Sequence, residues 1–316
     1  MKRILLVRWG GLGDLLVALP SVRLLRFGFP SATLTLIARR EFGSLLLQAE
    51  VVDEVVGLDD SMALTLFSDA GSAGEDRAAW LDGFNLVVSW MNQSKSGVPE
   101  AGRDRMNGGR QRLTICYDAR GRAAISAFFY RKTLEAVGRE LLQRADFHEC
   151  ARLPLSSIPG DPNLPFMRRP GRSGSLAVIH PGSGGEKKRW PLENFLAIAR
   201  RLKERDADGV FVTGEADAAL DRSVEAAARS LSWTFLHSPS LAALARLLGD
   251  ADLYLGNDSG VTHLAAACGT SVLALFRNDL VEIWRPFGDS RILSADTVDM
   301  IGLESVWSAV AQLLCR

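Results

Sequence analysis

The sequence predicts an α/β protein with two doubly wound, parallel-sheet domains that face a central cleft. Short apolar runs alternate with segments of helical periodicity in the first half of the 316 residues, which is typical of a parallel sheet wrapped by helices. Residues 154–175 then contain five prolines and three glycines, the composition of an interdomain linker. The alternation restarts after this stretch, so the second half predicts another sheet of the same kind.

Each continuous apolar run predicts a buried strand, and each periodic segment predicts a helix. The first half gives strands at 4–7, 32–37, 51–55 and 86–88 and helices at 15–26 and 42–48. The second half gives strands at 176–179, 210–212, 253–255 and 272–276 and helices at 192–204, 216–229, 241–248 and 261–267. We therefore expect an N-terminal domain at 1–155, a linker at 156–175 and a C-terminal domain at 176–316, whose last helix can return to pack on the first domain.

Charge and cysteine content exclude several classes of protein. Lys and Arg number 37, as do Asp and Glu, so the formal net charge is zero, whereas a nucleic-acid binder normally carries a basic excess. The four cysteines form no CxxC pair and so predict neither a zinc ribbon nor a redox motif; thiols in a reducing cytosol are the simpler interpretation. No charge-free apolar stretch reaches 18 residues, so we expect no membrane span, and the free thiols favour a cytoplasmic protein.

A glycine-rich turn, Gly10-Gly11-Leu12-Gly13-Asp14, follows the first predicted strand. Its spacing is not GxGxxG, which argues against an NAD-dependent oxidoreductase. Asp14 can be a first-turn acid that stabilises the helix. Alternatively, it is a general base at the carboxyl edge of the sheet, where open α/β folds bind ligands.

A second polar segment, 180–191, lies between a predicted strand and a predicted helix. Small residues and the hydroxyl of Ser183 precede the cations Lys187, Lys188 and Arg189, so the segment is a candidate phosphate cradle. The GK[ST] signature of a Walker A loop is missing. The alternative is a glycine turn with a solvated basic face.

A third segment, 256–263, joins a predicted strand to a predicted helix and contains Asn257-Asp258-Ser259-Gly260 and His263. Backbone N–H groups at the start of a helix suit a diphosphate. The alternatives are that Asp258 or Ser259 only caps the helix and that His263 is a polar residue satisfied within it.

Together these segments resemble the heptosyltransferase family, the ADP-heptose:lipopolysaccharide glycosyltransferases of glycosyltransferase family 9. The order and spacing of the motifs span nearly the whole chain. The matching residues are Gly13-Asp14 with Leu19-Pro20, Pro181-Gly182-Ser183 with Lys188-Arg189-Trp190-Pro191, Asn257-Asp258-Ser259-Gly260 with His263, and Trp284-Arg285-Pro286-Phe287-Gly288.

The resemblance implies a GT-B fold with an acceptor-binding first domain and a nucleotide-sugar-binding second domain. It implies transfer of heptose from ADP-heptose to a lipid A-linked lipopolysaccharide core, with inversion and with neither metal nor other cofactor. Asp14 would be the catalytic base, and Lys188 would stabilise the leaving diphosphate. The implied donor-binding residues are Gly13, Gly182, Ser183, Arg189, Glu215, Asp217, Asp258, Ser259, Gly260 and His263. Glu215 and Asp217 compete as the acid that meets the ribose, and Asp217 is the preferred choice.

Elementary chemistry agrees with this assignment. Glycosyl transfer from a nucleotide needs a base on one side of the sugar carbon and positive charge on the other side, where the diphosphate develops charge. Two alternatives remain: a related transferase that uses another nucleotide sugar for a different surface glycan, and a non-catalytic binding module. The presence of both Asp14 and Lys188 argues against the second.

Residues 103–152 carry eleven Lys and Arg residues against six Asp and Glu residues, a surplus of five in a chain of zero net charge. An ordinary solvated face explains such a surplus. Alternatively, a basic surface attracts an anionic lipid-linked acceptor and the inner face of the inner membrane, since each cation near a charged membrane contributes about 1 kcal/mol. We therefore expect peripheral membrane contact.

Overall fold

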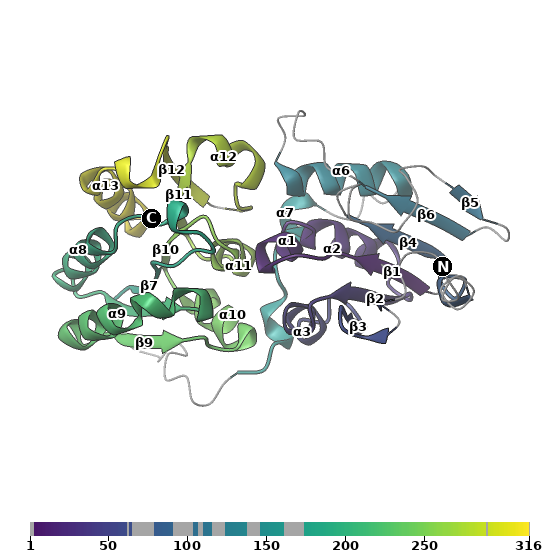
Figure 1. Cartoon of the computed structure of the whole chain (residues 1–316), viewed down its shortest axis with the longest axis horizontal. Helices are drawn as coiled ribbons and strands as arrows, with labels where there is room; N and C mark the ends of the chain where they lie inside the picture. Colours follow the sequence, from purple (N-terminus) through teal and green to yellow (C-terminus); the bar gives the residue numbers. More distant parts are fainter. Residues whose placement is uncertain are drawn as a thin grey trace. The chain divides into compact units, whose positions relative to one another are not determined.

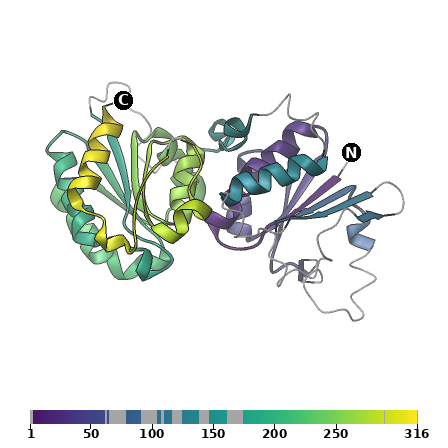
Figure 2. The same ribbon diagram turned by 90° about the horizontal axis from the view of Figure 1, so that it is seen from above.

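The computed structural model describes residues 3–61, 63–64, 79–90, 104–106, 110–115, 124–137, 146–160, 174–288 and 290–315 (Figures 1 and 2). The chain divides into two compact units, Met1–Ile158 and Pro159–Arg316, and the division falls inside the predicted linker 156–175. No helix in these ranges is long and apolar enough to cross a membrane.

The described part of the first unit contains a six-stranded sheet with the strand order β3-β2-β1-β4-β6-β5. Its strands are β1 (Arg3–Val7), β2 (Thr33–Ala38), β3 (Glu54–Gly57), β4 (Leu86–Ser89), β5 (Asp104–Met106) and β6 (Arg110–Thr114). Neighbouring strands are parallel except β5, which runs antiparallel to β6. The apolar run of β1 is buried from Ile4 to Val7, as a central parallel strand requires.

The first predicted helix is divided in the structure, and α6 (Ile125–Val137) and α7 (Phe147–Cys150) were not predicted. A single helix is predicted at 15–26, whereas the chain forms α1 (Leu12–Leu16) and α2 (Leu19–Gly28). Pro20 explains the break, because it has no N–H to donate and occupies the first turn of α2. Further helices among the described residues of this unit are α3 (Arg40–Gln48), α6, α7 and the short 3-10 turn η4 (Leu155–Ser157).

The second unit's sheet has the order β12-β11-β10-β7-β8-β9, and all of its strands are parallel. The strands are β7 (Leu176–His180), β8 (Asp208–Thr213), β9 (Thr234–His237), β10 (Leu253–Asn257), β11 (Val272–Arg277) and β12 (Ser290–Ala295). The helices are α8 (Leu192–Lys203), α9 (Ala218–Leu231), α10 (Leu241–Asp250), α11 (Gly260–Cys268), α12 (Asn278–Trp284) and α13 (Leu303–Leu314), with 3-10 turns η5 (Glu186–Lys188), η6 (Glu215–Asp217) and η7 (Val298–Met300). This order confirms the doubly wound prediction, and the strand order reverses between β7 and β10.

The final helix α13 packs within the second unit. Val306, Val310 and Leu313 are buried in one apolar core with Trp190 and Phe195. The apolar face of α13 is covered beside α8 within the second unit, and contact of this helix with the first domain stays a prediction.

Candidate active site

Two polar loops lie at the switch point of the second sheet. One follows β7 and leads through η5 to α8, and the other joins β10 to α11. Strands β7 and β10 are parallel neighbours, so the loops that leave their carboxyl ends start side by side. Open α/β sheets bind ligands at this place. The folded chain therefore brings the second and third candidate segments of the sequence together.

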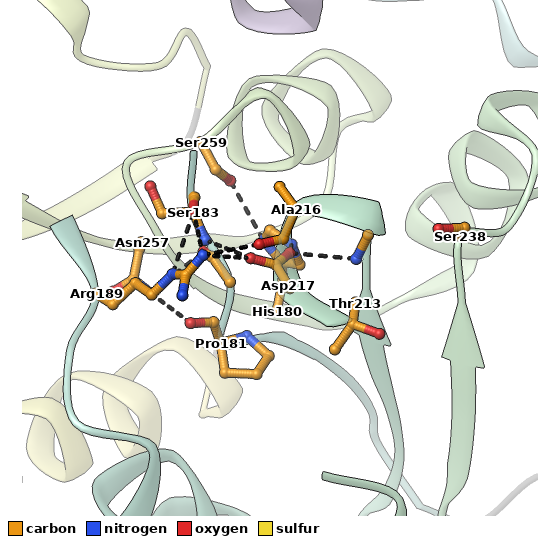
Figure 3. Close-up of polar contacts among 12 residues, drawn as sticks. His180, Pro181, Ser183, Arg189, Thr213, Ala216, Asp217, Ser238, Asn257 and Ser259 are labelled. Carbon is orange, nitrogen blue, oxygen red and sulfur yellow. Dashed lines mark hydrogen bonds and ion pairs between the residues drawn. The ribbon is translucent and has the colours of Figure 1, made fainter. Parts of the chain in front are cut away.

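A buried carboxylate, that of Asp217, is bonded to several donors around it (Figure 3). Its Oδ1 accepts hydrogen bonds from the backbone N of Ser183 at 3.1 Å and from Nη2 of Arg189 at 3.2 Å. Its Oδ2 accepts one from the backbone N of Gly214 at 3.2 Å and lies 3.3 Å from Nε2 of His180. Asp217 therefore connects the ends of β7 and β8 with the loop that carries Arg189.

These donors outweigh the effect of burial on the pKa of Asp217. Burial is the largest single influence and by itself raises the pKa, but the hydrogen bond and charge of His180, the Gly214 amide and the Arg189 guanidinium together bring the pKa below its ordinary value. The carboxylate packs tightly against the backbone of Gly182, since a Cβ on Gly182 would lie 2.0 Å from Oδ2 of Asp217. Only glycine fits at that position.

The two candidate acids for the ribose, Glu215 and Asp217, differ in burial. Asp217 is 3% exposed and both of its oxygens are occupied, so it is poorly placed to meet a ribose. Glu215 lies at the start of the same 3-10 turn and is exposed. Sequence spacing does not separate the two acids, because their difference in burial arises only when the turn packs under Gly182.

Asn257 joins the two loops. Its side chain is fully buried, its Oδ1 accepts a hydrogen bond from the backbone N of Trp190 at 3.0 Å, and its Nδ2 donates to the carbonyl of Pro181 at 2.9 Å. A second, longer contact joins Nδ2 to the carbonyl of Gly182 at 3.3 Å. One amide at the end of β10 thus binds both ends of the loop that follows β7.

The ion pair of Lys188 and Asp258 lies where these loops meet. Nζ of Lys188 is 2.6 Å from Oδ2 of Asp258, whose side chain is 7% exposed, whereas that of Lys188 is 38% exposed. The hydroxyl of Ser183 donates to the backbone carbonyl of Asp258 at 2.8 Å. A lysine ammonium has three donors, and Asp258 uses one of them. The others can reach an anion at the surface.

Helix α11 begins beside this ion pair. Ser259 caps it by accepting a hydrogen bond from the backbone N of Thr262 at 3.4 Å, and Oγ of Ser259 also lies 3.3 Å from Nδ1 of His180. Gly260 forms the first helical position, and His263 is 7% exposed one turn later. The capping role is therefore present, and the start of α11 follows Asp258, the partner of Lys188, directly in the chain.

In the first unit, Asp14 lies in the first turn of α1 and is paired with Arg8, the residue after β1. Nη2 of Arg8 is 2.8 Å from Oδ1 of Asp14, and the backbone N of Gly11 donates to Oδ2 at 3.0 Å. Gly10 has φ +134°, and a Cβ there would lie 2.6 Å from the Asp14 carboxylate. Gly13 occupies the same turn of α1. The pairing of Arg8 with Asp14 was not predicted from the sequence, although a charge directly after a buried strand is a signal for such a residue.

A model of glycosyltransferase family 9 (heptosyltransferase) matches residues 120–300, more than half of the 316 residues. The chain belongs to this family. This glycosyltransferase is also similar to lipopolysaccharide heptosyltransferase 1 of Pseudomonas aeruginosa, at 25% identity over 87% of this chain and 78% of the relative.

Solved structures support the family assignment at the level of the fold. The E. coli heptosyltransferase WaaC with ADP has a TM-score of 0.73 at 15% identity, over 99% of this glycosyltransferase and 100% of WaaC. A family 9 glycosyltransferase from Veillonella parvula has a TM-score of 0.71 at 16% identity, over 99% and 97% of the two chains. The predicted GT-B fold of two parallel-sheet domains is thereby confirmed.

The lowered pKa of Asp217 predicts how the stability of the enzyme depends on pH. A carboxyl group whose pKa falls on folding stabilises the protein above its unfolded pKa of about 3.9, and this contribution is lost as the pH falls through the folded value. Asp217→Asn should lower the free energy of unfolding at pH 7 by about 1–3 kcal/mol, because the buried donors on one of the two oxygens lose their acceptor and face an NH2 group instead. Its stability should also decline less steeply than wild type between pH 5 and pH 3, measured by urea unfolding.

Asp299→Asn is the matched control, because Asp299 is an exposed acid in the same unit. It should leave both the stability at pH 7 and its pH dependence close to wild type. An Asp217→Asn variant with wild-type stability and wild-type pH dependence would contradict the role of this carboxylate.

Proposed function

We propose that this glycosyltransferase moves heptose from ADP-heptose to a lipid A-linked lipopolysaccharide core, with inversion at the anomeric carbon and without a metal. The observation that carries the proposal is the Lys188–Asp258 ion pair beside the N-terminus of α11, at the switch point of the second sheet. Membership of the heptosyltransferase family and the names of the similar proteins support the choice of sugar and acceptor.

The second unit would bind the donor. Lys188 and the first-turn N–H groups of α11, beginning at Gly260, are the groups that can meet the diphosphate. Asp258, Ser183 and Arg189 act mainly by positioning, since their polar atoms are bonded to one another and to Asp217. Glu215, the exposed acid, replaces Asp217 as the group that meets the ribose hydroxyls.

The first unit would supply the base. Asp14 takes the proton of the acceptor hydroxyl while the acceptor oxygen forms its bond to the anomeric carbon. The bond from that carbon to the diphosphate breaks on the opposite side, so the configuration inverts. The diphosphate leaves with both electrons of that bond, and Lys188 and the start of α11 stabilise its charge.

Donor identity is tested by thermal unfolding with ADP-heptose, ADP, UDP-glucose and GDP-mannose, all in EDTA. A ligand at 100 times its Kd stabilises the folded protein by about 2.7 kcal/mol. We expect stabilisation by ADP-heptose and ADP only, and heptose transfer that survives EDTA. Stabilisation by a UDP or GDP sugar alone would favour the transferase of another surface glycan. A strict need for magnesium or manganese would contradict the metal-free reaction.

Replacing the proposed base should affect turnover rather than donor binding. Asp14→Asn should lower kcat by roughly 10²–10⁴, the usual contribution of general base catalysis, while the thermal shift with ADP stays at its wild-type value. Asp59→Asn changes an exposed acid of the same unit and should leave kcat unchanged. Near-native turnover in a folded Asp14→Asn protein would remove Asp14 from the mechanism.

Loss of the proposed phosphate contact should weaken donor binding and slow transfer together. Lys188→Ala should reduce kcat/KM for the donor by about 10²–10³, as one strong charged contact is lost. Lys188→Arg should restore only part of it, because a planar guanidinium does not reproduce a compact ammonium. Lys187→Ala is the control, since Lys187 is the exposed neighbour in the same 3-10 turn. Equal effects at positions 187 and 188 would show that only net charge matters.

We also propose cytoplasmic, peripheral contact with the inner face of the inner membrane through the basic segment 103–152. Arg103, Arg120, Arg122, Arg139 and Arg144 lie outside the described residues, and Lys132 pairs with Glu135 at 2.8 Å. Changing Arg103, Arg105, Arg110 and Arg112 to Glu should raise the acceptor KM at low salt and flatten its salt dependence. A folded variant with wild-type acceptor KM at both ionic strengths would leave this segment as solvated surface.

A further inference from the structure

We propose that Arg8 is the positioning residue for the Asp14 carboxylate, and that turnover depends on the contact between them. This inference rests on the proposed role of Asp14 as the base. It adds a residue that neither the motif nor the family resemblance singled out, and it assigns that residue a task which acts on kcat through Asp14.

The guanidinium of Arg8 makes three polar contacts and one contact with an aromatic ring. Nη2 is 2.8 Å from Oδ1 of Asp14, Nε donates to the backbone carbonyl of Asp14 at 2.8 Å, and Nη1 donates to the backbone carbonyl of Trp90 at 2.5 Å. The ring of Phe129 on α6 lies 5.3 Å from Cζ, within the range of a cation–π contact. Arg8 thus joins the end of β1, the first turn of α1, the end of β4 and α6.

Burial differs sharply between the two charges of this pair. The side chain of Arg8 is 8% exposed, whereas that of Asp14 is 35% exposed. Burial lowers the pKa of Arg8, and the nearby Asp14 charge partly offsets this. A cation so deeply placed is costly unless it is paired. The arrangement hides the cation and leaves the carboxylate accessible at the carboxyl edge of the sheet.

The contacts also fix how the carboxylate of Asp14 is turned. Arg8 binds Oδ1 from the interior and the backbone N of Gly11 binds Oδ2. An ionised carboxylate can accept about four hydrogen bonds, so capacity remains on the exposed side for an acceptor hydroxyl. Arg8 also binds the backbone of the same residue, so side chain and main chain of Asp14 are held by one rigid group.

Such positioning matters for proton transfer, because a base acts only when its oxygen lies within hydrogen-bond reach of the proton it removes. Misplacement by about 1 Å can cost roughly 10²-fold in rate. Arg8→Met should therefore lower kcat by roughly 10²-fold and leave the donor KM within about threefold of wild type. Arg8→Lys keeps the charge but loses the planar fork, so it should restore part of the lost kcat.

The decisive measurement is a double-mutant cycle with Asp14→Asn. If Arg8 acts through Asp14, Arg8→Met should lower kcat strongly in wild type and by less than about threefold when position 14 is already Asn. Thermal unfolding of every variant establishes that it is folded. If Arg8→Met does not fold, the cycle is made with Arg8→Lys, whose loss of kcat should likewise vanish in the Asp14→Asn background.

Arg26→Met is the matched control. Arg26 pairs with Asp53 at 2.5 Å and binds the carbonyls of Ala32 and Val51. These residues precede β2 and β3, respectively, so they lie away from the carboxyl ends of the strands. It should change stability but not kcat.

Two results would overturn the proposal: a folded Arg8 variant with wild-type kcat, or equal losses in the wild-type and Asp14→Asn backgrounds. Unchanged turnover in Asp14→Asn itself would instead refute the base.

Discussion

The second unit's site depends on one buried negative charge. The carboxylate of Asp217 is bonded to donors from the loop after β7, the loop after β8 and the approach to α8. A buried carboxylate is stable only while its partners stay in place. The three segments are therefore fixed relative to one another, and Arg189 adds bonds to the carbonyls of Ser183 and Ala216. Lys188 directly precedes Arg189 in the chain, so the bonds of Arg189 also restrict the position of the Lys188 backbone.

The first unit also has an ion pair with one buried and one accessible partner, but the buried partner is the cation. There the buried charge is the cation of Arg8, and the group left accessible is the carboxylate of Asp14. In the second unit the charges buried are those of Asp217 and Asp258, and the ammonium of Lys188 is left accessible. A sheet edge with an accessible anion suits a proton acceptor, and one with an accessible cation suits a phosphate. The chemical character of each sheet edge therefore depends on which partner of its ion pair is buried.

Much of this could be predicted from the sequence, because apolar runs and glycine-rich turns are local signals. The strands of both sheets that carry the site, β1, β7 and β10, were predicted from their apolar runs. Burial of polar residues was not predictable in the same way. Glu215 and Asp217 stand two residues apart, and only the packing of Gly182 on Asp217 decides which one is enclosed. Arg8 interrupts an apolar run, and its partners come from Asp14 and the distant Trp90.

The hydrogen bonds of Asn257 to Pro181 and Trp190 limit where the loop after β7 can change in length. Pro181 and Trp190 are tied to one side chain, and Ser183 and Lys188 to Asp258, so both ends of the loop are fixed. Between them, Gly184 and Gly185 have nothing within 4 Å of an added Cβ. Insertions at these two glycines would extend into open space without moving the cation, and the same insertions at Gly182 or Arg189 would not be tolerated. The two ends of the loop are therefore fixed, whereas the sequence and length at Gly184 and Gly185 can vary.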